Sequence, residues 1–375
     1  MFTNSYKPYT SGVVRSLETF KQHLENMGHT VYIFAPGYGT SDKDTRVFRY
    51  HSIPAPTARG YYLPIPLSWR TTRRVKKLGL DIIHVHAPTL LGQLGLMTGR
   101  RLGIPVVFTY HTRYDLYTHY VPIIGHSLRR LVERMATRFS NRCQSVIAPT
   151  PSIRSILTAN GVTTPIHVVP TGVDPQEFQS FNKTWAQEEF GLTDDDNVLV
   201  TVGRLGKEKN IGFLLKVMTQ LPSDVRLLIV GDGPLRANLR GEVTRLGLGE
   251  RVTFTGQLGR ERLASTMWAS KIFLFSSTTD TQGVVLLEAH LADLPVVALD
   301  APGAQDIITH GENGFLVEGM SVNGFADYTQ SLLTDAPMRE RMLAAGRRRV
   351  EDYTAEACAQ RLVEVYQATC AMGTE

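Results

Sequence analysis

Short apolar runs rich in β-branched residues alternate with amphipathic stretches along almost the whole chain, and this alternation limits the possible folds most strongly. The runs that we expect to form strands occupy residues 31–35, 81–86, 105–110, 145–148, 198–203, 225–231, 251–255, 271–275 and 295–299. Helix-like segments lie between them, for example residues 13–27, 90–102, 211–220 and 284–292. Strands that alternate with helices predict βαβ units and parallel sheets covered by helices on both faces. The expected fold class is therefore α/β.

The length of 375 residues suits two α/β domains better than one. The turn-rich segment Pro170-Thr171-Gly172-Val173-Asp174-Pro175 is the best boundary. We expect a Rossmann-like domain at 1–174, a second at 175–353, and a final helix at 354–375 that packs on either domain, with a return to the first as one option. Ligands of open α/β sheets bind beyond the carboxyl ends of the strands, so two facing domains predict a cleft between them.

The first strand of the N-terminal domain is short in this sequence. Met1-Phe2-Thr3 is followed at once by a turn-like segment at 4–12 and then by a helix. A doubly wound domain normally opens with a buried strand. We therefore expect that only the last residues of this strand are present, through a late start or a shortened form of the chain.

Composition excludes several classes of protein. Hydrophobic residues make up 42% and charged residues 20% of the chain, and the three cysteines fit no disulfide framework or zinc spacing. No apolar run approaches the roughly 20 residues that span a bilayer, and we expect a cytoplasmic protein. The net charge of +5 favours an anionic partner. The basic residues lack the interleaved aromatic side chains of a stacking platform, so we expect no nucleic-acid binding.

Two cations follow the expected strand at 198–203. Arg204 comes directly after Gly203, and Lys209 lies just before the next helix. Cations at a strand end and the N–H groups at a helix N-terminus together form an anion site. The alternative interpretation is a solvated surface loop.

A second candidate segment runs from Asp280 to Glu288. Gly283 allows a close approach of the backbone, and the first amides of the helix that begins near Val284 suit a phosphate. Glu288 lies inside that helix among apolar neighbours. It is either a surface residue or a ligand for hydroxyl groups, by analogy with the acid that binds ribose in dinucleotide folds.

These two segments together resemble the retaining GT-B glycosyltransferases of family 4, which carry a G-R-x(3,4)-K-N-like element and an E-x7-E element. The resemblance covers nearly the whole chain in family order. It includes 11–13, 81–86, 111–112, 170–174, 231–234, 294–298 and 311–317. The segments Tyr6-Lys7-Pro8-Tyr9-Thr10-Ser11-Gly12 and Thr281-Gln282-Gly283 look most like those of bacterial diacylglycerol α-glucosyltransferases.

The resemblance implies a GT-B fold with two Rossmann-like domains and a role for each matching residue. Arg204 and Lys209 would neutralise the departing donor diphosphate, Glu288 would bind the ribose hydroxyls, and Asp280 would contact the transferred sugar. His111 would lie at the reacting face of the sugar. The other donor-binding residues that the resemblance implies are Gly12, Gln282, Gly283 and Val284.

No metal or other cofactor is required by this scheme, because preorganised cations and dipoles meet the charge of the leaving group. His84 and His86 alternate on one strand but lack a carboxylate partner at ligand spacing, so we interpret them as packing at a strand end. Asp280 stands where the family usually has Glu. Its shorter side chain makes the identity of the sugar an open question.

The acceptor side is indicated by basic amphipathic segments in the first half. Residues 126–143 carry five arginines against one glutamate, with an apolar face formed by Leu128, Leu131, Val132, Met135 and Phe139. Such a helix lies on anionic lipid or is an ordinary half-buried helix. A second basic cluster comprises Arg70, Arg73, Arg74, Lys76 and Lys77.

We therefore expect a retaining hexosyltransferase that transfers glucose from UDP-glucose to a membrane lipid such as diacylglycerol, at the inner face of the cell membrane. One alternative keeps the enzyme class but uses phosphatidylinositol or a polysaccharide intermediate as acceptor. The alternative of another class is a non-catalytic protein that binds nucleotide sugars, suggested by Asp280 and the short first strand.

Overall fold

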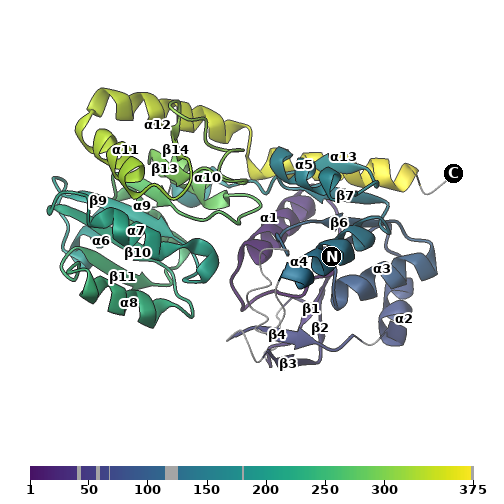
Figure 1. The fold of residues 1–375 in the computed structure, drawn as a ribbon. Helices are drawn as coiled ribbons and strands as arrows, with labels where there is room; N and C mark the ends of the chain where they lie inside the picture. Colours follow the sequence, from purple (N-terminus) through teal and green to yellow (C-terminus); the bar gives the residue numbers. More distant parts are fainter. Residues whose placement is uncertain (40–43, 56–59, 67, 115–125, 180, 373–375) are drawn as a thin grey trace. The chain divides into compact units, whose positions relative to one another are not determined.

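The computed structural model describes residues 1–39, 44–55, 60–66, 68–114, 126–179 and 181–372. The chain forms two compact units (Figure 1). The first unit contains Met1–Gly172 and Ala355–Glu375, and the second contains Val173–Thr354. The chain thus leaves the first unit, builds the second and returns.

The first unit is built on a parallel sheet. Its strands are β1 (Ile33–Pro36), β2 (Val47–Tyr50), β5 (Ile83–Val85), β6 (Val106–Thr109), β7 (Ser145–Ala148) and β8 (Ile166–Val168). β5, β6, β7 and β8 are neighbours in that order, and β1 pairs with β2. The short strands β3 (Ser52–Pro54) and β4 (Tyr62–Pro64) form a separate antiparallel pair.

Residues 1–3 occupy the position of the expected first strand. Phe2 bridges in parallel to Phe34 of β1 on one side and to Val85 of β5 on the other. The Phe2 amide donates to the carbonyl of His84 at 2.8 Å, and the Phe34 ring stacks on the Phe2 ring at 4.3 Å between centroids. Phe2 therefore joins the two halves of the sheet at its centre.

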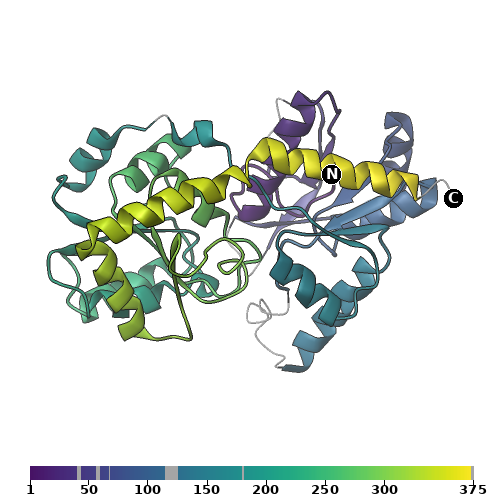
Figure 2. The same cartoon turned by 90° about the horizontal axis from the view of Figure 1, so that it is seen from above.

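Helices cover this sheet on both faces. They are α1 (Gly12–Asn26), α2 (Ser68–Leu78), α3 (Leu91–Leu102), α4 (His126–Ser140), α5 (Pro151–Ala159) and α13 (Ala355–Ala371). The Ser11 hydroxyl caps α1 by accepting from the Val14 amide. Helix α13 packs beside α1 and over β6 (Figure 2), where Tyr366 bonds to His84 and Thr369 to Ser145. The last helix therefore belongs to the first unit.

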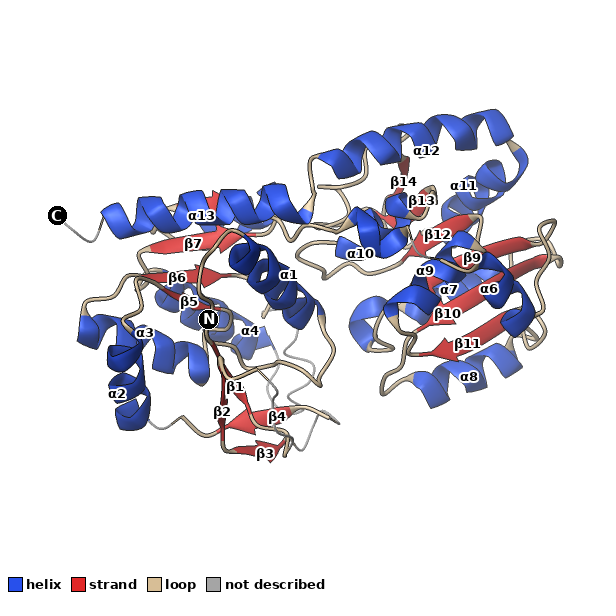
Figure 3. Cartoon of the chain, turned by 180° about the vertical axis from the view of Figure 1, so that it is seen from behind, coloured by secondary structure: helices blue, strands red, loops and turns tan. Residues whose placement is uncertain are grey.

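The described residues of the second unit form a six-stranded parallel sheet. The strands, in spatial order, are β11 (Val252–Gly256), β10 (Val225–Val230), β9 (Asn197–Val202), β12 (Ile272–Phe275), β13 (Val296–Leu299) and β14 (Gly314–Val317). Figure 3 shows these strands in red with helices in blue on both sides. The predicted parallel sheets are thus confirmed.

Helices and two 3₁₀ turns surround this second sheet. They are η2 (Pro175–Phe178), α6 (Lys183–Phe190), η3 (Lys207–Lys209), α7 (Ile211–Met218), α8 (Arg236–Arg245), α9 (Arg260–Trp268), α10 (Val284–Leu291), α11 (Val322–Thr334) and α12 (Ala336–Glu351). Leu227 and Ile229 of β10 face one core cluster, whereas Leu228 and Val230 face the other. This alternation explains why the strand sequence is apolar throughout: both faces of the sheet are buried.

One testable consequence of the packing concerns Gly92 in α3. A Cβ atom there would lie 1.6 Å from the carbonyl oxygen of Ala87, so we expect Gly92→Ala to destabilise the fold by about 1–3 kcal/mol, as overpacking does. Gly241 in α8 is the matched control, because a Cβ there meets nothing within 4 Å. Gly241→Ala should leave the melting temperature unchanged or raise it. Equal melting temperatures for both variants would contradict the described packing of α3.

Candidate functional site: an anion site at the strand reversal of the second unit

The strand order of the second sheet reverses between β9 and β12. From β9 the chain adds β10 and β11 on one side, then crosses back to place β12 on the other side of β9. Ligands of open α/β sheets bind beyond the carboxyl ends of the strands at such a reversal. The Arg204 segment follows β9, and the Asp280 segment follows β12. Topology therefore brings the two predicted motifs to the same edge of the sheet.

The loops that follow β9 and β12 are hydrogen-bonded to each other. The Ser276 hydroxyl donates to the carbonyl of Lys209 at 2.8 Å, and the Ser277 hydroxyl donates to the carbonyl of Glu208 at 3.0 Å. Both serines are buried. The backbone that carries the cations is therefore fixed by the neighbouring strand end.

Each predicted cation faces a carboxylate. The Lys209 ammonium lies 2.6 Å from Oδ2 of Asp280, 71 residues away in the sequence. Nη1 of Arg204 lies 3.3 Å from Oε1 of Glu208, whose side chain is only 4% exposed. Because these partners hold the two cations, the interpretation as a loop of freely solvated charges does not fit. The exposed lysine of this loop is Lys207.

Glycines let the backbone segments of the site approach closely. A Cβ at Gly203 would lie 3.4 Å from Cε of Lys209, so the lysine chain runs directly over this glycine. Gly231, after β10, has φ +135°, and a Cβ there would lie 2.0 Å from the carbonyl oxygen of Gly203. A residue with a side chain at 231 would push the Arg204 loop away from the sheet.

The second motif has the predicted local structure. Helix α10 begins at Val284, directly after Gly283. The Leu286 amide donates to the carbonyl of Gly283 at 2.8 Å, whereas helix geometry gives the Val284 and Val285 amides no partner within the helix. Gln282 precedes this turn, next to the segment that carries Asp280. The Glu288 side chain is only 8% exposed, so it is not a surface residue.

Arg260 is a site residue that the sequence did not indicate. Its Nη1 lies 2.7 Å from Oε1 of Glu288, and its Nη2 pairs with Glu177 of η2. Burial lowers the pKa of Arg260, but the Glu288 and Glu177 carboxylates outweigh this and hold the pKa above its ordinary value. Strand β12 lies between Arg260 and Glu288 in the chain, and β9, β10 and β11 lie between Glu177 and Arg260. Only the tertiary fold brings them together.

The remaining two predicted residues lie in the first unit. Gly12 is the first residue of α1, and a Cβ there would meet nothing within 4 Å. His111 follows β6, and its Nε2 lies 2.9 Å from Nδ1 of His86. The His86 ring in turn contacts the His84 ring, tilted by 32° with 4.0 Å between ring centroids. The two strand histidines therefore support His111 from inside the core.

Buried histidines in both units predict that the stability of the fold decreases at acidic pH. Burial lowers the pKa of His111 to about 4 and that of His290 in the second unit to about 4, against an ordinary value of 6.5. Between these values the unfolded chain binds more protons than the folded chain, so stability rises with pH through this window. We expect the melting temperature to fall as the pH drops from about 6.5 toward 4. The loss should be shallower in His111→Asn and His290→Asn, and an unchanged melting temperature between pH 7.5 and 5 would contradict the burial.

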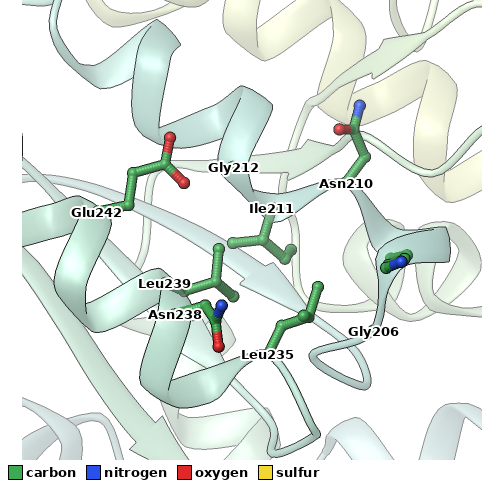
Figure 4. Close-up of a pocket in the computed structure, with 9 residues that line it drawn as sticks. Gly206, Asn210, Ile211, Gly212, Leu235, Asn238, Leu239 and Glu242 are labelled. Carbon is green, nitrogen blue, oxygen red and sulfur yellow. The ribbon is translucent and has the colours of Figure 1, made fainter.

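A pocket of about 270 Å³ lies beside the site, between the loop at 206–212 and helix α8 (Figure 4). Its wall includes Asn210, Leu235, Asn238 and the carboxylate of Glu242. Neither Arg204 nor Lys209 lines it. A diphosphate would meet a negative charge there without the two cations, so we place the candidate anion site at the strand ends instead.

In the described part of the chain, no group of three or more His, Cys, Asp or Glu side chains is arranged to hold a metal ion. None of the helices described has both the length and the apolar character needed to cross a membrane.

Comparison with known proteins places the chain in a family. Residues 10–177 match the model for Glycosyltransferase Family 4, and residues 182–349 match the model for Glycosyl transferases group 1. The alpha-monoglucosyldiacylglycerol synthase of Streptococcus pneumoniae is 29% identical over 98% of this chain and 84% of its own. The sulfoquinovosyl transferase SQD2 of Arabidopsis thaliana is 30% identical over 92% of this chain and 68% of its own.

The fold comparison agrees with these matches. The Anabaena protein HepE, solved in complex with UDP and glucose, superimposes with a TM-score of 0.79 at 19% identity, over 98% of this chain and 99% of its own. The structural neighbours share the GT-B fold with two Rossmann-like domains. The ordered motifs, the two parallel sheets and the sequence matches agree, and the chain belongs to the GT-B glycosyltransferases of family 4.

Proposed function

We propose that this glycosyltransferase transfers glucose from UDP-glucose to a membrane lipid such as diacylglycerol, with retention of anomeric configuration and without a metal ion. The observation that carries the proposal is that the Arg204 and Asp280 segments follow the neighbouring strands β9 and β12, where the Lys209 ammonium lies 2.6 Å from Oδ2 of Asp280. Its relatives include an alpha-monoglucosyldiacylglycerol synthase, and a structural neighbour is solved with UDP and glucose, which supports the choice of donor and acceptor.

The proposed chemistry follows from charge. As the bond from the sugar to the diphosphate breaks, negative charge grows on the phosphate oxygens. The Arg204 guanidinium, the Lys209 ammonium and the first-turn amides of α10 would neutralise it, and one preorganised donor of this kind is worth about 3–4 kcal/mol. Asp280 would hold hydroxyls of the sugar and Glu288 those of the ribose. His111 and Gly12, in the first unit, stay predicted donor-binding residues.

A donor screen tests this proposal. Thermal unfolding is measured with UDP, GDP and ADP and their glucose or mannose conjugates, followed by transfer assays with vesicles that contain diacylglycerol. A ligand that binds only the folded state at 100 times its Kd stabilises by about 2.7 kcal/mol. We expect UDP and UDP-glucose to stabilise most and lipid vesicles to be required for turnover. Turnover only with a soluble acceptor would overturn the lipid assignment, and no stabilisation by any nucleotide would overturn the donor assignment.

The proposed location is the inner face of the cell membrane, bound from the cytoplasm, and two cationic helices of the first unit support it. Helix α2 carries five basic and no acidic side chains, and its Trp69 is 60% exposed. On α4 the arginines are exposed, as are Leu131 at 50% and Met135 at 55%, whereas Phe139 is buried. The side chain of Leu128 lies outside the described residues. The predicted apolar face of α4 is thus divided, with one part in the core and one part in solvent.

Charge reversal on α2 tests the membrane contact. Cationic side chains near an anionic surface contribute about 1 kcal/mol each, so Arg73→Glu with Lys76→Glu should lower binding to phosphatidylglycerol vesicles by more than tenfold. Lys216→Glu with Arg245→Glu on the second unit is the control and should bind as the unaltered protein does. UDP-induced stabilisation should be equal in all three proteins. Equal vesicle binding would contradict a role of α2.

A further inference from the structure

The structure contains a partly buried ion-pair network around Arg260 that the proposed chemistry does not yet use. Arg260 is the first residue of α9, and its guanidinium reaches two carboxylates on two other elements, Glu288 of α10 and Glu177 of η2. The guanidinium also lies over the ring of Phe178, at 5.2 Å from its centroid. Three independent contacts therefore fix its position.

We propose that Arg260 is a positioning residue that orients Glu288 toward the ribose of the nucleotide and so sets the preference for ribonucleotides over 2′-deoxyribonucleotides. This inference rests on the proposed function, because it assigns the ribose to Glu288. Arg260 lies outside both motifs, and its effect is measurable as the preference for ribonucleotides.

The Glu288 side chain is buried within α10. A carboxylate in an apolar helix environment either takes up a proton or requires a cationic partner. Arg260 supplies that cation through a charge-assisted bond of 2.7 Å to Oε1. The Glu288 carboxylate therefore has a cationic partner, and a carboxylate held in this way accepts hydrogen bonds from hydroxyl groups.

Geometry then selects the rotamer of Glu288. Arg260 engages Oε1, and among the described residues no side chain is seen to donate to Oε2. Arg260 is itself held from its far side by Glu177. The carboxylate is thus fixed at one oxygen and open to a ligand at the other. A site built to bind a hydroxyl in this way disfavours the analogue that lacks it, because a charged acceptor is left without its donor.

The effect is measured as a ratio of affinities. Whichever of UDP, GDP and ADP stabilises the protein is compared with its 2′-deoxy counterpart by isothermal titration calorimetry. For the unaltered protein we expect the ribonucleotide to bind about 10- to 100-fold more tightly, as for a hydrogen bond to a charged group. In Arg260→Gln the ratio should fall below about 3-fold, because Glu288 is released to other rotamers.

Two further variants separate positioning from simple structural support. Glu177→Gln cuts the other arm of the network but keeps the contact between Arg260 and Glu288, so the ratio should stay above about 10-fold. Arg260→Lys keeps a cation but loses the two-pronged fork, so its ratio should fall at least threefold. Arg260→Lys also serves if Arg260→Gln does not fold, as judged by its melting curve.

Each outcome decides the question. An unchanged ratio in a folded Arg260 variant would show that this arginine is only a structural link, and an equal loss in Glu177→Gln would assign the discrimination to the packing of η2. Either result overturns the inference while the proposed function stands. If none of the three nucleotides binds the unaltered protein, the proposed function fails and the inference fails with it.

Discussion

Lys209→Ala should lower kcat for sugar transfer by a factor of about 10² to 10³, as loss of one preorganised donor to a developing anion does elsewhere. Lys209 follows the carboxyl end of β9, where the strand order reverses, and its ammonium lies 2.6 Å from Oδ2 of Asp280. Its charge is therefore in place before the diphosphate departs. The loss should appear mainly in kcat, because the phosphate charge grows as the bond breaks. Steady-state kinetics with UDP-glucose and diacylglycerol vesicles measure it.

The same loop offers a matched control for this experiment. Lys207 is the same residue type two positions earlier, it is exposed, and it lines the neighbouring pocket rather than the anion site. Lys207→Ala should change kcat by less than threefold. Melting curves of both variants show whether Lys209→Ala is folded despite the loss of its ion pair. A folded Lys209→Ala protein with a kcat close to that of Lys207→Ala would remove the electrostatic basis of the proposed function.

Asp280→Asn should separate nucleotide binding from sugar transfer. The substitution removes a carboxylate beside Lys209, so UDP should bind as tightly as before or more tightly. Transfer from UDP-glucose should fall by about 10- to 100-fold, because charge-assisted bonds to the sugar hydroxyls are lost. Calorimetry measures the affinity for UDP, and steady-state kinetics with UDP-glucose measure the rate of transfer. A parallel loss of UDP affinity would show that Asp280 acts on the nucleotide rather than on the sugar.

Asp280→Glu restores the residue that the family usually has. With 2.6 Å between Lys209 and Asp280, the longer side chain cannot extend without moving the lysine. We therefore expect transfer to persist but the ratio of turnover with UDP-glucose to that with UDP-galactose to change. An unchanged ratio would mean that the length of this side chain does not select the sugar.

Much of the fold follows from local patterns. The apolar runs at 198–203 and 225–231 became β9 and β10 with ends shifted by about one residue, because both faces of these strands are buried and the apolar signal is continuous. The strands β2, β3, β4, β8 and β14 were not predicted. All five are short, and β2, β3 and β8 have no buried residue along their length, so their residues show no such pattern.

Pairing partners could not be predicted in the same way. The sequence placed Arg204 and Asp280 after two separate strands, but that β9 and β12 are neighbours is a property of the sheet. The contact between Arg260 and Glu288 depends further on how α9 and α10 pack, and Arg260 itself lies in no motif. Residues within one strand-loop-helix unit could therefore be predicted, whereas partners from different units could not.

The path of the chain through its two units has a practical consequence. Val173 pairs with Thr354 by a parallel bridge, and the Val173 amide donates to the carbonyl of Tyr353 at 2.9 Å, so the entry and exit of the second unit are adjacent. Residues 173–354 can therefore be exchanged as one segment, because the first and last residues of the segment lie next to each other. Replacing this segment with the corresponding segment of a relative should give a chimaera with the sugar-donor preference of that relative. The acceptor preference of the chimaera should stay that of the protein that supplies the first unit.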